Sequence, residues 1–121
     1  MMARLYVIQD DLFFAERARA VAGRLGIEPK FLTASEAATR AWEPGSVVVV
    51  QVTLHPDRQL ALVERLTKAV PAPRVVAVTG HLETVLRSRA KALGATLAAH
   101  SSMERTLARA CQVEPSADHG A

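Results

Sequence analysis

Short apolar runs alternate with longer amphipathic stretches along the chain. Five runs are predicted to be strands: Leu5–Ile8, Lys30–Leu32, Val47–Val52, Arg74–Val78 and Ala95–Ala99. The first is a continuous apolar run typical of a strand that is buried on both faces of a parallel sheet, whereas the second and the fifth are weaker. The third run begins with four consecutive valines, whose branched side chains favour strands, so we expect it at the centre of the sheet.

The stretches between these runs have the spacing of amphipathic helices. The first predicted helix follows Asp10 and Asp11, which can cap it, and ends near Gly26. Its apolar residues recur at three- and four-residue spacing: Phe14, Ala18, Val21, Ala22 and Leu25. The second predicted helix is short, begins at Ser35 and ends before Pro44.

Three further helices are predicted in the second half of the chain. The third has one apolar face, which consists of Leu60, Val63, Leu66 and Val70. The fourth covers Leu82–Leu93 and ends at Gly94, a residue suited to a left-handed cap. Ser101 and Glu104 have capping-box spacing, which predicts the start of the last helix, Met103–Cys111.

Strict alternation of strands and helices predicts a parallel sheet with helices on both faces, because each crossover connection is right-handed. Five such units fit an α/β three-layer sandwich of the flavodoxin-like type, with five helices and a five-stranded parallel sheet of order 2-1-3-4-5. Ligands bind beyond the carboxyl ends of the strands in this architecture. The predicted crevice is lined by Gln9, Asp10, Asp11, Gln51 and Thr79.

Length and composition indicate a single globular domain. The chain has 121 residues, 50% hydrophobic and 22% charged, which is enough for one core and too apolar for a disordered chain. We expect a domain over residues 1–112 and a flexible tail over residues 113–121, which has little to bury. No apolar run approaches the ~20 residues that span a bilayer and no signal-peptide pattern opens the chain, so we expect no membrane contact and a cytoplasmic location.

Cysteine content, charge and motifs limit the candidate functions. The single Cys111 cannot form an internal disulfide, and its spacing from Leu107 predicts a small buried hydrophobic residue without a redox role. The net charge of +3 is modest and gives only weak support to a nucleic-acid partner. The sequence contains no glycine-rich phosphate loop, catalytic-triad spacing or zinc signature, which argues against an enzyme.

Four short motifs occur in order along the chain. They are the acidic turn after the first strand, the third strand followed by a nearby proline, Thr79-Gly80-His81 after the fourth strand, and Gly94-Ala95 before the fifth. With these motifs, residues 4–112 resemble a response-regulator receiver domain of the CheY-like type.

The resemblance implies a particular chemistry for the crevice. In a receiver domain, two acids after the first strand and an aspartate after the third hold Mg²⁺, and that aspartate accepts a phosphoryl group from a histidine kinase. By resemblance, Gln9 and Asp10 match the acidic pair, with Asp11 as a substitute for the missing member. Gln51 takes the phosphoacceptor position, and Thr79 matches the hydroxyl residue that contacts the phosphoryl oxygens.

Several of these positions depart from the receiver pattern. His100 or Ser101 takes the position of the lysine after the fifth strand, and neither supplies a fixed positive charge at neutral pH. Gln51 carries a carboxamide, which is a poor nucleophile and cannot form an acyl phosphate. Mg²⁺ prefers carboxylate oxygens, so Asp10 and Asp11 are weak metal candidates and we expect neither Mg²⁺ nor another cofactor. The resemblance therefore predicts a degenerate receiver, or pseudo-receiver, that lacks the phosphoacceptor aspartate.

Simpler structural roles compete with functional ones in the crevice. Asp10 and Asp11 can act as acids at a helix N-terminus, and Thr79 can be a turn-forming hydroxyl. His55 and His81 follow predicted strands, but they lack the regular spacing of metal ligands.

Packing and capping also explain two residues outside the receiver motifs. Asp57 lies six residues after Gln51 at a helix start, so a cap explains it better than a displaced phosphoacceptor does. Trp42 ends an amphipathic stretch, and we expect it to pack against the core.

The last two predicted helices carry a mixed apolar and basic surface. Receivers use these helices for dimerisation and output, so the resemblance makes this surface a candidate interface; a solvated helical face is the alternative. The candidate residues are Leu86, Arg87, Arg89, Ala90, Lys91, Arg105, Leu107 and Arg109. We expect a homodimer formed through these helices and the fifth strand, or through the first and fifth helices.

The sequence thus favours a stand-alone receiver-like module that acts in signalling or regulation by protein–protein interaction, independently of aspartyl phosphorylation. The identity of its protein partner does not follow from the sequence. One alternative is an unusual single-domain response regulator that accepts phosphate or a metal through Asp10 or Asp11. Another is a small nucleic-acid-binding regulator that uses the arginines of the last helices.

Overall fold

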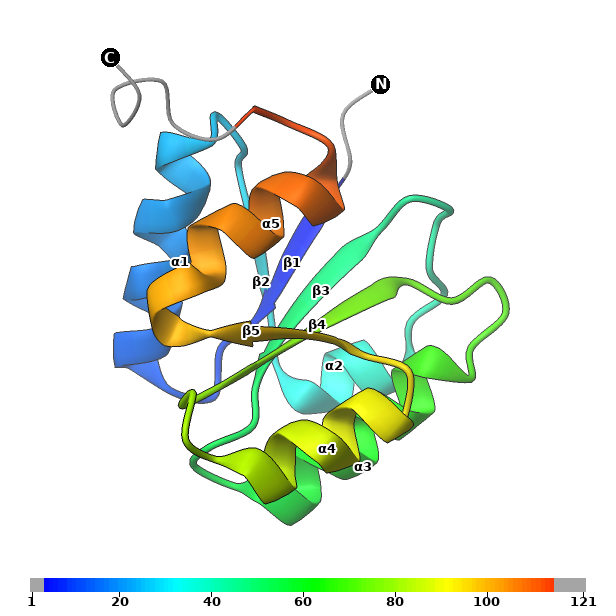
Figure 1. Ribbon diagram of the computed structural model, residues 1–121. Coiled ribbons are helices and arrows are strands. Elements are labelled where there is room, and N and C mark those ends of the chain that lie inside the picture. The colour runs from blue at the N-terminus through cyan, green and yellow to red at the C-terminus, as the bar shows by residue number, and fades with distance from the viewer. Residues whose placement is uncertain (1–3, 115–121) are drawn as a thin grey trace.

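The computed structural model describes residues 4–114 and shows a parallel sheet between two layers of helices (Figure 1). The strands are β1 (Leu5–Ile8), β2 (Lys30–Leu32), β3 (Val47–Gln51), β4 (Arg74–Thr79) and β5 (Thr96–Ala99). They are all parallel and lie in the order β2-β1-β3-β4-β5. The predicted strands and their 2-1-3-4-5 order are confirmed.

Five α-helices cover the two faces of this sheet. They are α1 (Leu12–Arg24), α2 (Ala34–Thr39), α3 (Pro56–Thr67), α4 (Thr84–Ala92) and α5 (Met103–Cys111), with a short 3₁₀ turn, η1 (His100–Ser102), before α5. Helices α1 and α5 pack on one face, and α2, α3 and α4 pack on the other (Figure 1). Within residues 4–114, none of the helices is long and apolar enough to cross a membrane.

The sheet separates two hydrophobic clusters, because successive side chains of a strand point to opposite faces. Val47 and Val49 of β3 pack with α1 and α5, whereas Val48 and Val50 pack with α2, α3 and α4. All four valines are at most 1% exposed. Strand β3 pairs with β1 on one side and β4 on the other, so the predicted central position of this strand is confirmed.

Helix α1 forms as its apolar spacing predicts. Every residue of the predicted stripe, from Phe14 to Leu25, is buried, and Asp11 caps the helix by accepting a hydrogen bond from the Phe13 amide at 3.0 Å. Gly26 follows the helix with φ of 73°, a conformation that glycine adopts without strain. The predicted packing roles of Trp42, which is 5% exposed, and Cys111, which is 2% exposed, are also confirmed. Burial raises the pKa of the Cys111 thiol to about 11, so it stays protonated.

The two predicted helix caps at serines are wrong by one or two residues. Helix α2 begins at Ala34, and Thr33 is its cap: the Thr33 hydroxyl accepts from the Glu36 amide at 3.1 Å, while the Glu36 carboxylate accepts from the Thr33 amide at 2.8 Å. Ser35 therefore lies inside the first turn. Helix α5 begins at Met103 as predicted, but the η1 turn precedes it, and Ser102 rather than Ser101 is its N-cap residue. The Ser102 hydroxyl accepts from the Ala99 amide at 3.1 Å.

Two residues around α3 also differ from their predicted roles. Helix α3 ends at Thr67, so Val70 falls in the following turn and is 96% exposed rather than part of the buried face. His55 occupies the N-cap position without a side-chain cap bond, and Asp57 lies in the first turn. The Asp57 side chain is 95% exposed and comes no closer than 3.7 Å to Arg89, so it does not cap the helix.

Packing continues slightly beyond the predicted domain boundary. Val113 is half-buried against the α1–α5 cluster, and its amide donates to the Ala108 carbonyl at 2.9 Å. Residues 115–121, which form most of the predicted tail, lie outside the described residues.

The capping box of α2 gives a prediction about stability. Thr33→Ala removes the hydroxyl that accepts from the Glu36 amide, so we expect a loss of about 1 kcal/mol in the free energy of unfolding. Ser35→Ala is the matched control, because Ser35 is an exposed residue two positions after Thr33. This substitution should change the free energy of unfolding by less than ~0.5 kcal/mol. Urea unfolding followed by circular dichroism measures both, and equal effects of the two substitutions would contradict the assignment of the cap.

Candidate functional site

The carboxyl ends of four adjacent strands bring the predicted crevice residues to one edge of the sheet. Gln9 directly follows β1, Gln51 ends β3, Thr79 ends β4, and His100 directly follows β5. The register pairs Gln51 with Val78 and Thr79 with Ala99, so these strand ends lie side by side. The site described below is this edge together with the first turns of the helices that leave it.

The two acids after β1 are both engaged by other parts of the chain. Asp11 accepts the Phe13 amide at the start of α1, which is the simpler of its two predicted roles. Asp10 has a side chain that is 21% exposed and lies 3.5 Å from the Arg58 guanidinium of α3. An arginine beside Asp10 reduces the negative potential that a divalent cation requires.

Gln51 sits at the end of β3 beside a second glutamine that the sequence did not single out. The side-chain amide of Gln59, which is 3% exposed, donates to the Gln51 carbonyl at 3.1 Å. The Gln59 Oε1 atom is buried and has no hydrogen-bond partner within residues 4–114. The side chains of Gln51 and Gln59 are both neutral amides, so neither supplies a carboxylate at the end of the third strand.

Thr79 is fully buried and has an arginine as its partner. The Arg87 guanidinium of α4 donates to the Thr79 hydroxyl at 3.0 Å, and Arg87 is half-buried in this position. Thr79 is the last residue of β4 rather than part of a turn, so the turn-forming role considered for it is wrong. Arg87 was expected on an outer interaction surface, but its guanidinium reaches the strand end instead.

Glu83 connects the loops that follow β3 and β4. Its carboxylate accepts from the Thr53 hydroxyl and from the Gly80 amide, each at 2.6 Å. These two hydrogen bonds, the one from the Thr53 hydroxyl first, lower the pKa of Glu83 against the opposing effect of burial. Gly80 is three residues from Glu83, but Thr53 is 30 residues away in the chain, so no local pattern predicts this bridge.

His100 occupies the position directly after β5, and Ser101 follows it as an exposed residue. The imidazole is half-buried edge-on against Phe14, with ring centroids 6.3 Å apart. Burial lowers the pKa of His100, and the positive charge of Arg17 adds to this effect. The ring is therefore neutral at pH 7 and does not supply the positive charge that a lysine supplies.

Histidines and carboxylates do not form a metal centre at this edge. Within the described residues, no group of three or more His, Cys, Asp or Glu side chains is placed to hold a metal ion. His55 and His81 are both exposed, as expected for loop residues.

Exposed apolar side chains gather around the same edge. Of the six large hydrophobic residues that are exposed within residues 4–114, five follow the ends of β1, β3 or β4: Leu12, Phe13, Leu54, Leu82 and Val85. Phe13 is 84% exposed and Leu82 is 80% exposed. Their exposure was not evident from the sequence, because at helical spacing they resemble core residues.

The predicted interaction surface on α4 and α5 is only partly exposed. Ala90 and Leu107 are 0% exposed, so they belong to the two cores and their assignment to the surface is wrong. Both lie on the sheet-facing sides of their helices, which the apolar spacing alone did not distinguish from an interface. Leu86 is half-buried, whereas the basic residues that remain at the surface are Arg89, Lys91, Arg105 and Arg109.

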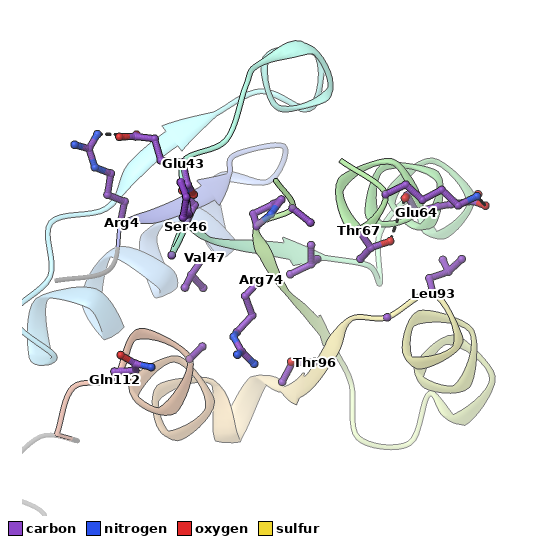
Figure 2. Close-up of a pocket in the computed structure, with 18 of the residues that line it drawn as sticks. Arg4, Glu43, Ser46, Val47, Glu64, Thr67, Arg74, Leu93, Thr96 and Gln112 are labelled. Carbon is purple, nitrogen blue, oxygen red and sulfur yellow. Dashed lines mark hydrogen bonds and ion pairs between the residues drawn. The ribbon is translucent and has the colours of Figure 1, made fainter. Parts of the chain in front are cut away.

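A broad groove lies at the opposite, amino-terminal edge of the sheet (Figure 2). It encloses about 970 Å³, and Arg74 extends into it between Gln112 and Thr96 (Figure 2). Its carboxylates are already paired: Glu43 with Arg4 and Glu64 with Lys68, each at 2.9 Å. Ligands of this architecture bind at the carboxyl edge, so the size of this groove alone does not make it the functional site.

The Glu83 bridge predicts a pH-dependent stability. Glu83→Gln should lower the free energy of unfolding by about 1 kcal/mol near neutral pH, because an amide weakens two charge-assisted hydrogen bonds. The folded pKa of Glu83 lies below the unfolded value of 4.5, so this stabilisation is present above that value and is lost as pH falls through the folded pKa. Urea unfolding should show that the difference in free energy of unfolding between the parent protein and Glu83→Gln is smaller at about pH 3 than at neutral pH.

Glu64→Gln is the matched control for this measurement. Glu64 makes an exposed ion pair with Lys68, so its substitution should cost less than ~0.5 kcal/mol at either pH. A Glu83→Gln effect that stays constant between the two pH values would contradict the role of the carboxylate charge.

Comparison with known proteins identifies the fold. No protein-family model matches the sequence, and no curated protein matches it. A response regulator from Thermotoga maritima aligns with a TM-score of 0.74 and 15% identity over 93% of this chain and 99% of that chain. A response regulator receiver protein from Burkholderia phymatum aligns with a TM-score of 0.71 and 20% identity over 93% of this chain and 98% of that chain. A response regulator protein from Burkholderia pseudomallei aligns with a TM-score of 0.68 and 22% identity over 91% of this chain and 66% of that chain. The chain thus has the five-stranded α/β fold of response-regulator receiver domains.

Proposed function

We propose that this protein is a receiver-like regulatory module that acts by binding protein partners and does not accept a phosphoryl group on an aspartate. The observation that carries this proposal is Gln51 at the carboxyl end of β3, the position of the phosphoacceptor in the receiver resemblance. The matching Burkholderia pseudomallei structure holds a phosphorylated aspartic acid and a calcium ion. In this chain the corresponding chemistry would start from an amide, which cannot form an acyl phosphate.

The surroundings of Gln51 support the same proposal. Phosphoryl transfer requires positive charge near the developing oxyanion and carboxylates that hold the metal. Asp10 is paired with Arg58, Arg87 is bonded to Thr79, and His100 is neutral at pH 7. Each group that would act on a phosphoryl oxygen or a metal therefore already has a partner within the chain or lacks the necessary charge.

These internal contacts also fix the loop after β4 without any phosphate. Glu83 bonds this loop to the loop after β3, and Arg87 joins α4 to the end of β4. The first turn of α4 is thereby held in one position relative to the sheet. We infer that the module presents a constitutive binding surface rather than one that phosphorylation switches.

The absence of phosphorylation is directly testable. Acetyl phosphate with Mg²⁺ should leave the intact mass of the protein unchanged, because the amide of Gln51 is not a competent nucleophile. Gln51→Asp is the matched variant, since it returns the carboxylate at the same strand end; a mass gain in this variant alone assigns the loss to that residue. Stoichiometric, acid-labile phosphorylation of the parent protein would refute the proposal.

Exposed apolar side chains at the start of α4 provide a candidate surface for a second copy of the chain. Leu82 is 80% exposed and Val85 is 70% exposed. The exposed basic residues nearby in the fold are Arg89 and Lys91 of α4 and Arg105 and Arg109 of α5. Interfaces commonly combine apolar anchors with a charged rim, and a homodimer buries the same patch on both subunits. We therefore propose a homodimer through α4, β5 and α5, with Val85 as an anchor in place of the buried Ala90 and Leu107.

Sedimentation velocity at micromolar concentration tests this assembly. Val85→Glu should weaken dimerisation about tenfold or more, because it places a charge in a desolvated contact. Val70→Glu is the matched control, since Val70 is 96% exposed in the turn after α3, away from α4 and α5. A monomer at all concentrations, or equal effects of the two substitutions, would overturn the proposed interface.

A further inference from the structure

A second groove, of about 410 Å³, lies between α2 and α3 and is separate from the edge at Gln51. Its floor is apolar and buried: Ala37 and Leu66 are 1% exposed and Trp42 is 5% exposed. Two further alanines, Ala38 and Ala69, are half-buried and leave space that larger side chains would fill. The remaining lining residues are all cations: Arg40, Arg65 and Lys68.

Arg40 is held in this groove by aromatic rings rather than by an acid. Its guanidinium carbon lies 4.5 Å from the Tyr6 ring centroid and 5.0 Å from that of Trp42. Its Nη2 donates to the Tyr6 hydroxyl at 3.2 Å, and its Nε donates to the Ala41 carbonyl at 3.3 Å. The residue is half-buried, and within the described chain no carboxylate lies within ion-pair distance of it.

A second fixed cation lies on the other side of the groove. The Arg65 Nε donates to the Ala38 carbonyl of α2 at 2.7 Å, which positions the guanidinium across the gap between the helices. Among residues 4–114, Arg65 also has no carboxylate within ion-pair distance. Lys68 pairs with Glu64, but no acidic residue lines the groove itself. The groove therefore combines an apolar floor with two arginines, Arg40 and Arg65, that have no acidic partner among the described residues.

We propose that this groove binds a small amphipathic oxyanion, with its apolar body against Ala38, Ala69 and the edge of Trp42 and its carboxylate or phosphate on Arg40 and Arg65. A partly buried cation is costly without a counter-charge, and the planar guanidinium matches both oxyanions in a bidentate manner. The volume falls within the ~300–1,000 Å³ typical of small-molecule sites. Eight residues line the groove, far fewer than the ~20–30 residues that each partner contributes to a standard protein interface.

The single tryptophan of the chain reports directly on this groove, because Trp42 lines it. We expect decanoate or decyl phosphate, below their micelle concentrations, to produce a saturable change in Trp42 emission, and the tighter binder identifies the preferred head group. Decyltrimethylammonium has the same apolar body and the opposite charge, and acetate has the negative charge but no apolar body. Neither compound should produce a saturable change in Trp42 emission. No saturable change with either decyl anion, or an equal change with the decyl cation, would overturn the proposal.

Variants separate the head-group contacts from the apolar body. Arg65→Gln and Arg40→Gln should each weaken the affinity for the decyl anion about tenfold, because each removes one charge-assisted contact. Ala38→Leu should abolish binding by filling the groove while both arginines remain. Arg19→Gln, a substitution at an exposed arginine of α1 on the opposite face of the sheet, should leave the affinity unchanged.

Circular dichroism and thermal melting establish that each variant is folded, and Arg65→Gln and Ala38→Leu keep the test decisive if Arg40→Gln unfolds. Unchanged affinity in both of these variants would refute the assignment of the groove. Saturable binding of an acidic Glu- and Leu-containing peptide, with no response to either decyl anion, would also refute it and would indicate a protein-docking groove.

Discussion

The burial of β3 on both of its faces is the constraint on which the rest of the structure depends. Its four valines are divided between two hydrophobic clusters, and each contributes about 1.5–3 kcal/mol through burial of its side chain. Hydrogen bonding to β1 on one side and β4 on the other leaves neither edge of the strand free. A shift of one residue would move every valine to the opposite face and change the position of Gln51 at the strand end.

The geometry of the carboxyl edge follows from this central strand. Because β1, β3, β4 and β5 are parallel and adjacent, their last residues meet at one edge whatever side chains they carry. In this chain the meeting residues are mostly neutral, and the charged groups Asp10, Glu83 and Arg87 near them each have a partner within the chain. The chain thus has the receiver fold, and the carboxyl edge of its sheet carries Gln51 together with the contacts of Arg58, Glu83 and Arg87.

Arginines have three different structural roles in this protein. Arg58 and Arg87 contact the polar groups at the carboxyl edge, Arg24 joins α1 to α5 through Glu104 at 2.6 Å, and Arg40 stacks on aromatic rings. The planar guanidinium suits each role, because it can stack on aromatic rings, donate two hydrogen bonds to one partner and remain charged when it is partly buried. These arginines therefore serve separate local contacts in different parts of the fold.

The sequence by itself determined the order of the elements, the central position of the valine strand and the identity of the residue at each strand end. These features are local or follow from the handedness of parallel crossovers, so hydrophobic spacing is sufficient to predict them. Only the tertiary structure decided which side chains meet. Glu83 and Thr53 are 30 positions apart, and Arg40 and Tyr6 are 34 apart, so no local pattern relates them. It also decided that Ala90 and Leu107 are core residues while Phe13 and Val85 are exposed, because the face of a short helix that meets the sheet depends on how the whole helix packs.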